Sequence, residues 1–228
     1  MRKEIENYER KELFNNFDRD NPFIFLTTKV NITNIYKNCK DYYPSIAYFI
    51  TKAVNQIENF RYRYENGKFY LYDEIKPNFT HMLKDHNIGF FQCDLKDNYI
   101  DFVKEYKTKK EILLSTNKSI YGQNQGEIWF SYVPWYHVTG LVTPFSKEIT
   151  VPQFIWDKFS IENDECFINL TIMVHHGFVD GYHIGLFLQK LEELIKNIDN
   201  YITEYQILFF SCYNTCKWRC KDVKCKKI

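Results

Sequence analysis

Glycine and proline are scarce in this chain, with eight glycines and six prolines among 228 residues. No stretch is rich in proline, glycine or serine, and no segment repeats along the sequence. These absences argue against a flexible inter-domain linker and against a repeat architecture. The simplest organisation is therefore a single domain.

An excess of charge of one sign is also missing, since 30 basic residues face 29 acidic ones and the net charge is +1. Such a balance argues against nucleic acid or another polyanion as a partner. No apolar run approaches the length that spans a bilayer. The N-terminal residues Met1–Glu6 lead into charged sequence without the apolar core of a signal peptide. We therefore expect a cytoplasmic protein with no membrane partner.

The seven cysteines do not form a recognisable framework. Three are scattered, and four crowd the last stretch of the chain: Cys212, Cys216, Cys220 and Cys225. A cytoplasmic setting argues against disulfides, and the four tail cysteines do not fall into two C-x-x-C knuckles, so zinc is only weakly indicated. We predict one domain over residues 1–205 and a Cys- and Lys-rich tail of unknown role over 206–228.

Apolar residues, by contrast, are abundant. Hydrophobic residues make up 45% of the chain and aromatic residues alone 18%, well beyond what a disordered chain carries. A chain of 228 residues with this composition is long enough to bury a substantial core.

Periodicity predicts strands and helices that alternate along the chain. The expected elements are a helix near 3–14, a strand over 23–30, a helix beginning near Pro44, a hairpin around Asn66-Gly67, a helix over 97–114, strands near 127–133, 139–143 and 167–174, and a helix after His183. This order predicts an α/β fold in which helices pack on a mixed β-sheet.

The segment Val174–His183 places a pair of adjacent histidines, an aspartate and two glycines between a predicted strand and a predicted helix. Rigid elements on both sides hold a side chain in a defined place. An imidazole held there is suited to general-base chemistry near neutral pH. The alternative is a pair of core histidines with a purely structural role.

This segment resembles the HHxxxDG motif of the chloramphenicol acetyltransferases and of the catalytic domains of dihydrolipoyl acyltransferases. Two other segments are similar to the first family in order and spacing. Tyr8–Phe14 resembles W-x-R-x-x-H-F, with tyrosine for tryptophan and leucine for histidine, and Ser131–Trp135 resembles S-x-x-P-W. The resemblance extends to about residue 200. It implies a two-layer α+β sandwich with the CoA-dependent acyltransferase fold.

The resemblance also implies an activity, namely an acetyl-CoA-dependent O-acetyltransferase that inactivates chloramphenicol and so confers antibiotic resistance. The family's base carries over to His176 and its oxyanion donor to Ser131, while Arg10 carries over as the partner of Asp180. Losing either charge of that pair would cost about 3–5 kcal/mol if the pair is buried. Acetyl-CoA enters as a co-substrate, and neither a permanently bound cofactor nor a metal is implied.

The resemblance further places the binding residues. Four aromatic residues correspond to positions in the family's apolar acceptor pocket: Phe17, Phe25, Tyr121 and Phe90 (or its neighbour Phe91). Trp135 corresponds to the coenzyme channel, and Lys158-Phe159 resembles a Lys–Tyr pair near the coenzyme's nucleotide end. In the family, these pockets lie at subunit interfaces of a homotrimer, where each catalytic histidine faces a neighbour's pocket.

Three departures from the family's pattern put the acceptor in doubt. His137 follows Trp135 where the family has a short polar segment with phenylalanine, Phe178 adds bulk behind the base, and Ile155 replaces a threonine. A family member that acetylates another small hydroxylated metabolite or antibiotic is therefore the first alternative. A dihydrolipoyl acyltransferase is less favoured, because those enzymes usually carry lipoyl and linker regions ahead of the catalytic domain. The non-enzymatic alternative is a drug-binding protein or a metal-binding assembly module.

Overall fold

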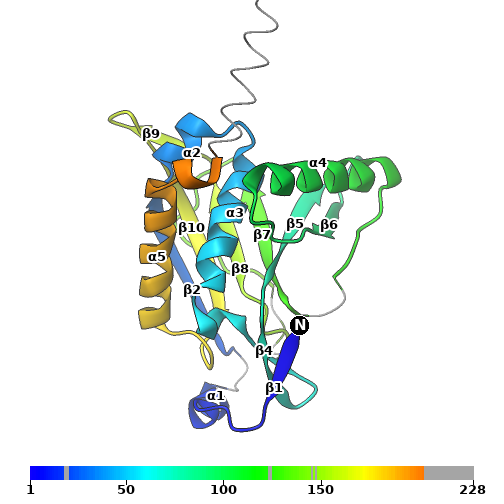
Figure 1. Ribbon diagram of the computed structural model, residues 1–228, viewed down its shortest axis with the longest axis vertical. Coiled ribbons are helices and arrows are strands. Elements are labelled where there is room, and N and C mark those ends of the chain that lie inside the picture. Colours follow the sequence, from blue (N-terminus) through cyan, green and yellow to red (C-terminus); the bar gives the residue numbers. More distant parts are fainter. Residues whose placement is uncertain (18–20, 123–124, 145, 147, 203–228) are drawn as a thin grey trace, which may run out of the picture.

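The structure is a computed structural model that describes residues 1–17, 21–122, 125–144, 146 and 148–202 (Figure 1). The predicted tail over 206–228, with its four cysteines, lies outside the described residues. The boundary near residue 205 therefore stays a prediction.

The described chain forms two sheets and several helices. The strands are β1 (Arg2–Ile5), β2 (Phe23–Asn31), β3 (Tyr62–Glu65), β4 (Lys68–Tyr72), β5 (Lys76–Met82), β6 (Ile88–Gln92), β7 (Glu127–Val133), β8 (Gln153–Asp157), β9 (Ser160–Glu162) and β10 (Glu165–His175). The helices are α1 (Lys11–Phe17), α2 (Thr33–Asn38), α3 (Tyr42–Asn55), α4 (Tyr99–Thr116) and α5 (Gly181–Lys196), with a 3₁₀ turn at Glu58–Arg61.

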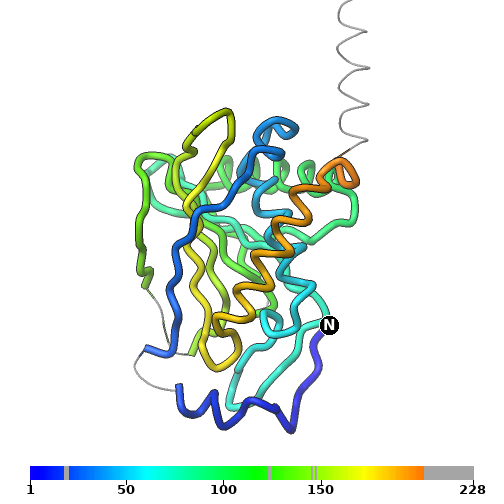
Figure 2. The backbone as a smooth tube through the Cα atoms, turned by 90° about the vertical axis from the view of Figure 1, so that its left-hand side faces the viewer, coloured from blue at the N-terminus to red at the C-terminus, as the bar shows by residue number. Residues whose placement is uncertain are grey.

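The large sheet has the strand order β2-β10-β8-β7-β5-β6, and β9 extends it beside β10. The β5–β7 and β7–β8 pairs are parallel and the other pairs are antiparallel, so the sheet is mixed as predicted. A separate three-stranded antiparallel sheet, β1-β4-β3, lies beside α1 at one end of the molecule (Figures 1 and 2).

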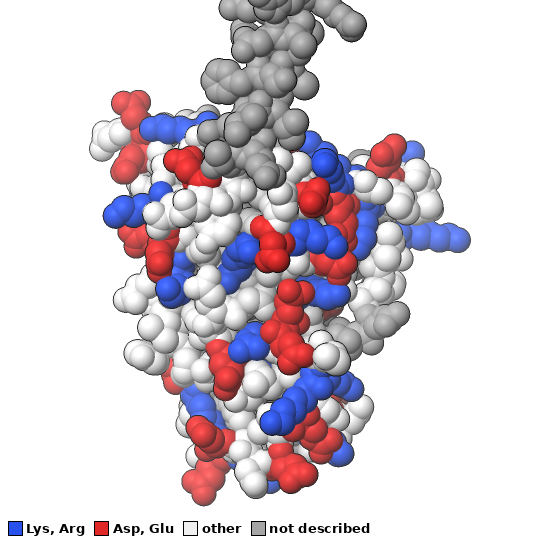
Figure 3. All heavy atoms as spheres, in the orientation of Figure 1, with Lys and Arg blue, Asp and Glu red and all other residues white. Residues whose placement is uncertain are grey.

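Helices α3 and α5 pack on the same face of the large sheet (Figures 1 and 2). Alternate residues of β10 point into this layer and join the core: Cys166, Ile168, Leu170, Ile172 and Val174. The buried stripe of α5 meets them with Ile184, Phe187, Leu191, Leu194 and Ile195. Burial of such side chains at about 1.5–3 kcal/mol each is the main driving force for this layer. On the outer surface of this layer, cationic and anionic side chains are interspersed (Figure 3).

The opposite face of the large sheet carries the other half of the β10 side chains, including Thr171 and Met173, and we call it the open face. An irregular segment over 134–144 lies against part of it, because Val138 N donates to Asp157 and Thr143 Oγ1 donates to Gln153. The two-layer arrangement thus leaves one sheet face without helical cover among the described residues.

Most predicted elements are present. The strand over 127–133 is confirmed in its bounds as β7, and the predicted strands over 23–30 and 167–174 correspond to β2 and β10. The Asn66-Gly67 turn joins β3 to β4, and both of its residues have positive φ (52° and 81°), as a type I′ hairpin turn requires. Helix α4 begins after Asn98, whose Oδ1 accepts from Ile100 N at 2.8 Å.

The helix predicted near 3–14 is wrong over its first half. Residues Arg2–Ile5 form β1, which pairs with β4, and the helix covers only Lys11–Phe17. Cross-strand contacts offset the helical propensity of this charged segment: Lys68 Nζ lies 2.9 Å from Glu4, and the Arg2 guanidinium lies over the ring of Tyr70 at 4.2 Å.

The strand predicted near 139–143 is also wrong. These residues form the irregular segment on the open face, and the next strand is β8, which begins at Gln153. Residues of β8 are buried throughout, so the strand shows no alternation of polar and apolar side chains by which it could be recognised.

Candidate functional site

The histidine pair lies where β10 ends and the chain turns into α5. The backbone N–H groups of Phe178 and Val179 both donate to the carbonyl of His175 at 3.0 Å, which closes a tight turn. Gly177 is required here, because a Cβ on it would lie 2.6 Å from the ring of Phe14 and 2.9 Å from the Phe14 backbone. Helix α1 therefore rests directly on this turn.

His175 has a structural environment. Its side chain is buried, its Nδ1 accepts from the Gly177 N–H at 3.1 Å, and its ring stacks on Phe14 with centroids 4.8 Å apart. Because the lone pair of Nδ1 already accepts a hydrogen bond from the backbone, this nitrogen is not available to take a proton from a substrate. This geometry gives the first histidine of the pair a structural role.

His176 is held differently. Its backbone N–H donates to the carbonyl of Pro22 at 2.8 Å, and its half-buried ring stacks on Phe17 with centroids 3.8 Å apart. Its Nδ1 is buried and has no hydrogen-bond partner among the described residues. Ring stacking and the backbone thus orient this imidazole, and no neighbouring side chain that the structure describes occupies its nitrogen atoms.

Arg10 and Asp180 form the ion pair that the sequence predicts. Arg10 Nη2 lies 2.9 Å from Asp180 Oδ2, and Arg10 Nη1 donates to the Phe178 carbonyl at 2.7 Å. Asp180 also caps α5, since its Oδ1 accepts from Tyr182 N at 3.0 Å and His183 N at 3.4 Å. The pair therefore ties the segment before α1 to the start of α5.

The electrostatics of Asp180 favour its charged form. Burial alone would raise the pKa of this carboxyl, but the His183 ring, the His183 backbone N–H and Arg10 together hold the pKa below its usual value. The side chains of Arg10 and Asp180 are 20% and 32% exposed. The loss of about 3–5 kcal/mol expected for a buried pair therefore does not apply, and about 1–2 kcal/mol fits a partly exposed pair.

Ser131 lies in the middle of the open face, on β7. Its neighbours across the sheet are Ile155 on β8 and then Thr171 on β10, in one row. His176 follows five residues after Thr171, about 16 Å along the strand, while two strand spacings add about 10 Å across the sheet. The backbone positions of Ser131 and His176 in one chain therefore lie roughly 19 Å apart by these spacings, too far for their side chains to act on the same atoms.

Comparison with known proteins identifies the family. A family model described as chloramphenicol acetyltransferase matches residues 1–192. The chain belongs to the chloramphenicol acetyltransferase family. It is similar to chloramphenicol acetyltransferases of Campylobacter coli (28% identical, covering 85% of this chain and 97% of that protein) and Clostridium perfringens (28%, covering 83% and 95%).

Solved structures show the same fold. A chloramphenicol acetyltransferase structure superposes with a TM-score of 0.71 at 23% identity, covering 86% of this chain and 100% of that one. A dihydrolipoamide acetyltransferase of Azotobacter vinelandii superposes with a TM-score of 0.64 at 11% identity, covering 84% and 88%. The predicted α/β fold and the predicted family are confirmed, and the protein is an acyltransferase.

The four aromatic residues predicted for the acceptor pocket fall into two separate groups. Phe17 and Phe25 lie on the β2 side, near His176, whereas Phe90 and Tyr121 lie at the β6 edge with ring centroids 6.3 Å apart. The two edges are five strand spacings apart in the sheet order, about 24 Å. A single chain of this chloramphenicol acetyltransferase family member cannot bring them into one pocket.

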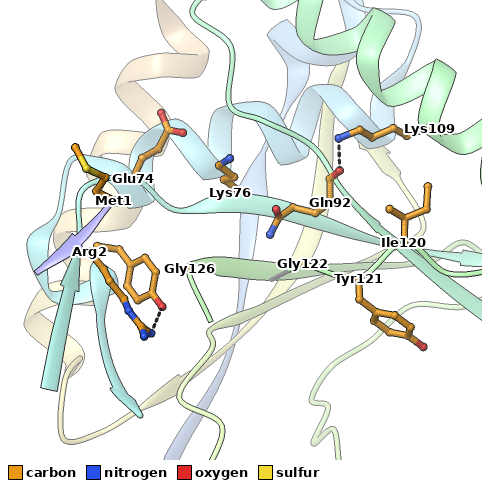
Figure 4. A pocket seen from close by; sticks show the side chains of 11 residues that line it. Met1, Arg2, Glu74, Lys76, Gln92, Lys109, Ile120, Tyr121, Gly122 and Gly126 are labelled. Carbon is orange, nitrogen blue, oxygen red and sulfur yellow. Dashed lines mark hydrogen bonds between the residues drawn. The ribbon is translucent and has the colours of Figure 1, made fainter. Parts of the chain in front are cut away.

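A cavity lined by both charged and apolar side chains lies beside Tyr121. It has a volume of about 800 Å³, and Figure 4 shows Gln92, Lys76, Glu74 and Lys109 around it. Next to it Glu127 is buried on the open face and accepts from three neutral donors: Asn78 Nδ2 at 3.0 Å, Gln92 Nε2 at 2.7 Å and Trp129 Nε1 at 2.6 Å. The surroundings of Tyr121 thus differ from the apolar pocket that the resemblance implies.

Two of the three residues predicted for coenzyme A, Trp135 and Lys158, share one corner of the large sheet, whereas Phe159 packs toward α2 and α3 on the helix-covered side. Trp135 follows the end of β7, Lys158 follows the end of β8, and these strand ends are paired through Val133 and Asp157. The side chain of Lys158 is exposed, and Trp135 is 64% exposed. Phe159 packs among the rings of Tyr36, Tyr42 and Tyr132.

Sequence reasoning missed residues that support the motif turn from outside it. Asn59 Nδ2 donates to the Phe178 carbonyl at 2.9 Å, and Tyr8 Oη donates to the Gly177 carbonyl at 3.1 Å. It also missed Asp157, a fully buried carboxylate on the open face. The available signal was an aspartate that closes the otherwise apolar run Phe154-Ile155-Trp156.

Among the described residues, no group of three or more histidine, cysteine, aspartate or glutamate side chains lies close enough together to hold a metal ion. Within the same residues, every helix is too short or too polar to cross a bilayer.

Replacing Asp180 by asparagine is expected to lower the free energy of unfolding by about 1 kcal/mol, a drop in Tm of about 2–4 °C. Asparagine still caps α5 through its amide oxygen, but its NH₂ group then faces the guanidinium, so the ion pair and hydrogen bond with Arg10 are lost. Activity falls as well, because the pair holds the turn that carries His176. Thermal melts and turnover measure both effects, with Asp164→Asn as the control at an exposed turn position.

The same variant should show a defined pH dependence. The folded pKa of Asp180 is lower than the unfolded value of about 3.9, so the stabilisation is complete above that pH and is lost as the pH falls through the folded pKa. The difference in Tm between wild type and Asp180→Asn should shrink below about pH 4. A difference that stays constant down to pH 2 would contradict an ionic role for Asp180.

Proposed function

We propose that this protein transfers the acetyl group of acetyl-CoA to a hydroxyl of chloramphenicol and so confers resistance to the drug. The observation that carries the proposal is the His175–Asp180 turn, in which one histidine is tied into the fold while His176 stacks on Phe17 and its ring Nδ1 has no hydrogen-bond partner among the described residues. The relatives with similar sequences are chloramphenicol acetyltransferases.

In the proposed mechanism, His176 takes the proton from the acceptor hydroxyl as that oxygen attacks the thioester carbonyl of acetyl-CoA. The carbonyl oxygen becomes an oxyanion, which the Ser131 hydroxyl stabilises by donating a hydrogen bond. The tetrahedral intermediate then collapses, the carbon–sulfur bond breaks, and the protonated imidazole returns its proton to the departing thiolate. The products are the acetyl ester and free CoA, with no acyl-enzyme.

We further propose that each active site is built from two copies of the chain in a homotrimer. The roughly 19 Å between His176 and Ser131 within one chain supports this, as does the separation of Phe17 and Phe25 from Phe90 and Tyr121. In a cyclic trimer the surface that carries His176 meets the open face of the neighbour, so three identical sites form. Because the reaction consumes acetyl-CoA, we place the protein in the cytoplasm.

The decisive experiment follows the release of free CoA thiol from acetyl-CoA in the presence and absence of chloramphenicol. We expect release that depends on the drug, and a product whose mass exceeds that of the drug by one acetyl group. If a saturating concentration of chloramphenicol adds nothing to the background rate, chloramphenicol is not the acceptor.

A second acceptor class is supported by the charged cavity beside Tyr121. Lys76, Lys109 and Glu74 would favour a more polar hydroxylated metabolite or antibiotic over the nitrophenyl ring of chloramphenicol. A panel of small alcohols in the same thiol assay separates the two candidates. A kcat/KM for another alcohol far above that for chloramphenicol would favour this second class.

Ser131→Ala is expected to lower kcat by roughly 10²–10³ while KM for both substrates stays nearly unchanged. The hydroxyl acts on charge that develops in the transition state, so its loss affects the chemical step more than binding. Steady-state kinetics with each substrate varied in turn test this. A variant in which KM rises and kcat is unchanged would show that Ser131 binds substrate in its ground state.

A further inference from the structure

Asp157 is a carboxylate that the proposed chemistry does not use. It is the last residue of β8, on the open face, and it pairs with Val133, two residues after Ser131 on β7. Its side chain is completely buried. A buried carboxylate is costly unless hydrogen bonds satisfy it, so its partners show what it holds in place.

Those partners come from two segments of the chain. Asn169 on β10 donates twice, from its backbone N to Oδ1 and from Nδ2 to Oδ2, both at 2.8 Å. The 134–144 segment supplies the others: Val138 N donates to Oδ2 at 2.9 Å, and His137 Nδ1 lies 3.3 Å from Oδ2. Asp157 therefore fastens the start of this segment to the strands β8 and β10.

The fastened residues adjoin the coenzyme corner. His137 and Val138, which contact Asp157, follow Trp135 by two and three residues. Lys158 follows Asp157 directly. The side chain of Trp135 is 64% exposed, so its position depends largely on its backbone. The segment has no helix or strand of its own to fix that backbone.

We propose that Asp157 is a positioning residue for the coenzyme, which holds the His137–Val138 backbone and so keeps Trp135 in place beside Lys158. The inference rests on the proposed use of acetyl-CoA at this corner. A loop already held in its binding conformation loses less entropy when the ligand binds, so the hydrogen bonds to Asp157 should raise the affinity for the coenzyme. Asp157 itself plays no part in the proposed proton transfer by His176.

Asp157→Asn tests this positioning role with almost no change in the shape of the side chain. The carboxylate accepts at both oxygens, whereas an amide that keeps the bond from Asn169 N turns its NH₂ group toward Val138 N–H and Asn169 Nδ2. The NH₂ group and the Val138 N–H are both donors, so the hydrogen bond between them is lost and the 134–144 segment is no longer held at this point. We expect the Kd for CoA, measured by titration calorimetry on the full-length protein, to rise roughly tenfold.

The matched control is Asp164→Asn, which removes the same charge at an exposed turn between β9 and β10. It should bind CoA as wild type does. In Asp157→Asn, KM for acetyl-CoA should rise while KM for the acceptor stays within about twofold, a split that general loosening of the fold would not produce. Amide hydrogen exchange should increase at Val138, which loses its acceptor.

His137→Ala provides a second variant should Asp157→Asn fail to fold. Its side chain is 47% exposed, and its loss leaves the three other hydrogen bonds of Asp157 in place. A smaller rise in the Kd for CoA, about two- to threefold, is expected. Unchanged CoA affinity in the folded variants overturns the positioning role alone. If the wild type itself binds no CoA, the proposed function fails with it, whereas loss of chloramphenicol turnover with CoA binding intact removes only the acceptor.

Discussion

His176→Ala is expected to lower kcat for acetyl transfer by roughly 10²–10⁴, the contribution of a well-placed general base. Without the imidazole, a hydroxyl whose pKa lies far above neutral must attack without losing its proton to the protein. Stability should change little, because the turn is held by Gly177, by the Arg10–Asp180 pair and by the His175 stack. Thiol release and thermal melts of the same preparation measure both quantities.

The control is His86→Asn, which removes an exposed histidine at a turn where φ is 64°, a conformation that asparagine tolerates. This variant should keep wild-type kcat. If His176→Ala retained kcat within a few-fold of wild type, another group would have to serve as the base. The proposed mechanism would then be wrong, although the family assignment would stand.

The strand–turn–helix around His176 could be predicted because its signals are local. An apolar, β-branched run, a turn with glycines and a helical stripe from Ile184 onward each act within a few residues. The same holds for the Asn66-Gly67 hairpin and for β7. These segments kept the structure that their own sequence favours.

Elements decided by distant contacts could not be predicted in the same way. The segment Arg2–Ile5 becomes a strand because β4 offers it an edge, nearly 70 residues further along the chain. Buried β8 lacks the alternation that marks a strand, and the segment over 139–143 has strand-like residues but is bound to the sheet face by Asp157 and Gln153.

For the candidate site, the sequence suggests residues by resemblance, but it does not predict how they are arranged. The Arg10–Asp180 pair was predicted by resemblance and is present, but its partial exposure, which sets its energy, depends on how α1 packs on the turn. Phe17, Phe25, Phe90 and Tyr121 were predicted to line one pocket. Only the strand order β2-β10-β8-β7-β5-β6 shows that they lie on opposite edges of one chain.

Mixing two inactive variants is expected to restore activity. Under the proposed mechanism His176→Ala lacks the base and Ser131→Ala lacks the oxyanion donor, so the proposed homotrimer of either variant would be impaired at all three sites. If a site combines His176 of one copy with Ser131 of its neighbour, a mixed trimer contains sites in which both residues are intact. Random mixing of equal amounts places an intact pair at roughly a quarter of the sites, because each of the two copies must be the right variant.

Co-expression with two different affinity tags allows the mixed trimers to be isolated before thiol release is measured. Each isolated mixed trimer carries one intact site among its three, so activity near a third of wild type per site, against the residual rates of the two parents, is the expected result. The control co-expresses the double variant His176→Ala/Ser131→Ala with wild type, whose isolated mixed trimers contain about a sixth of intact sites under the shared-site arrangement but about half under a single-chain site. A site within one chain cannot be repaired by mixing, because every copy of either single variant carries its own defect. Mixed trimers that are no more active than their parents would therefore mean that His176 and Ser131 of the same chain act in one site, despite the roughly 19 Å between their backbone positions.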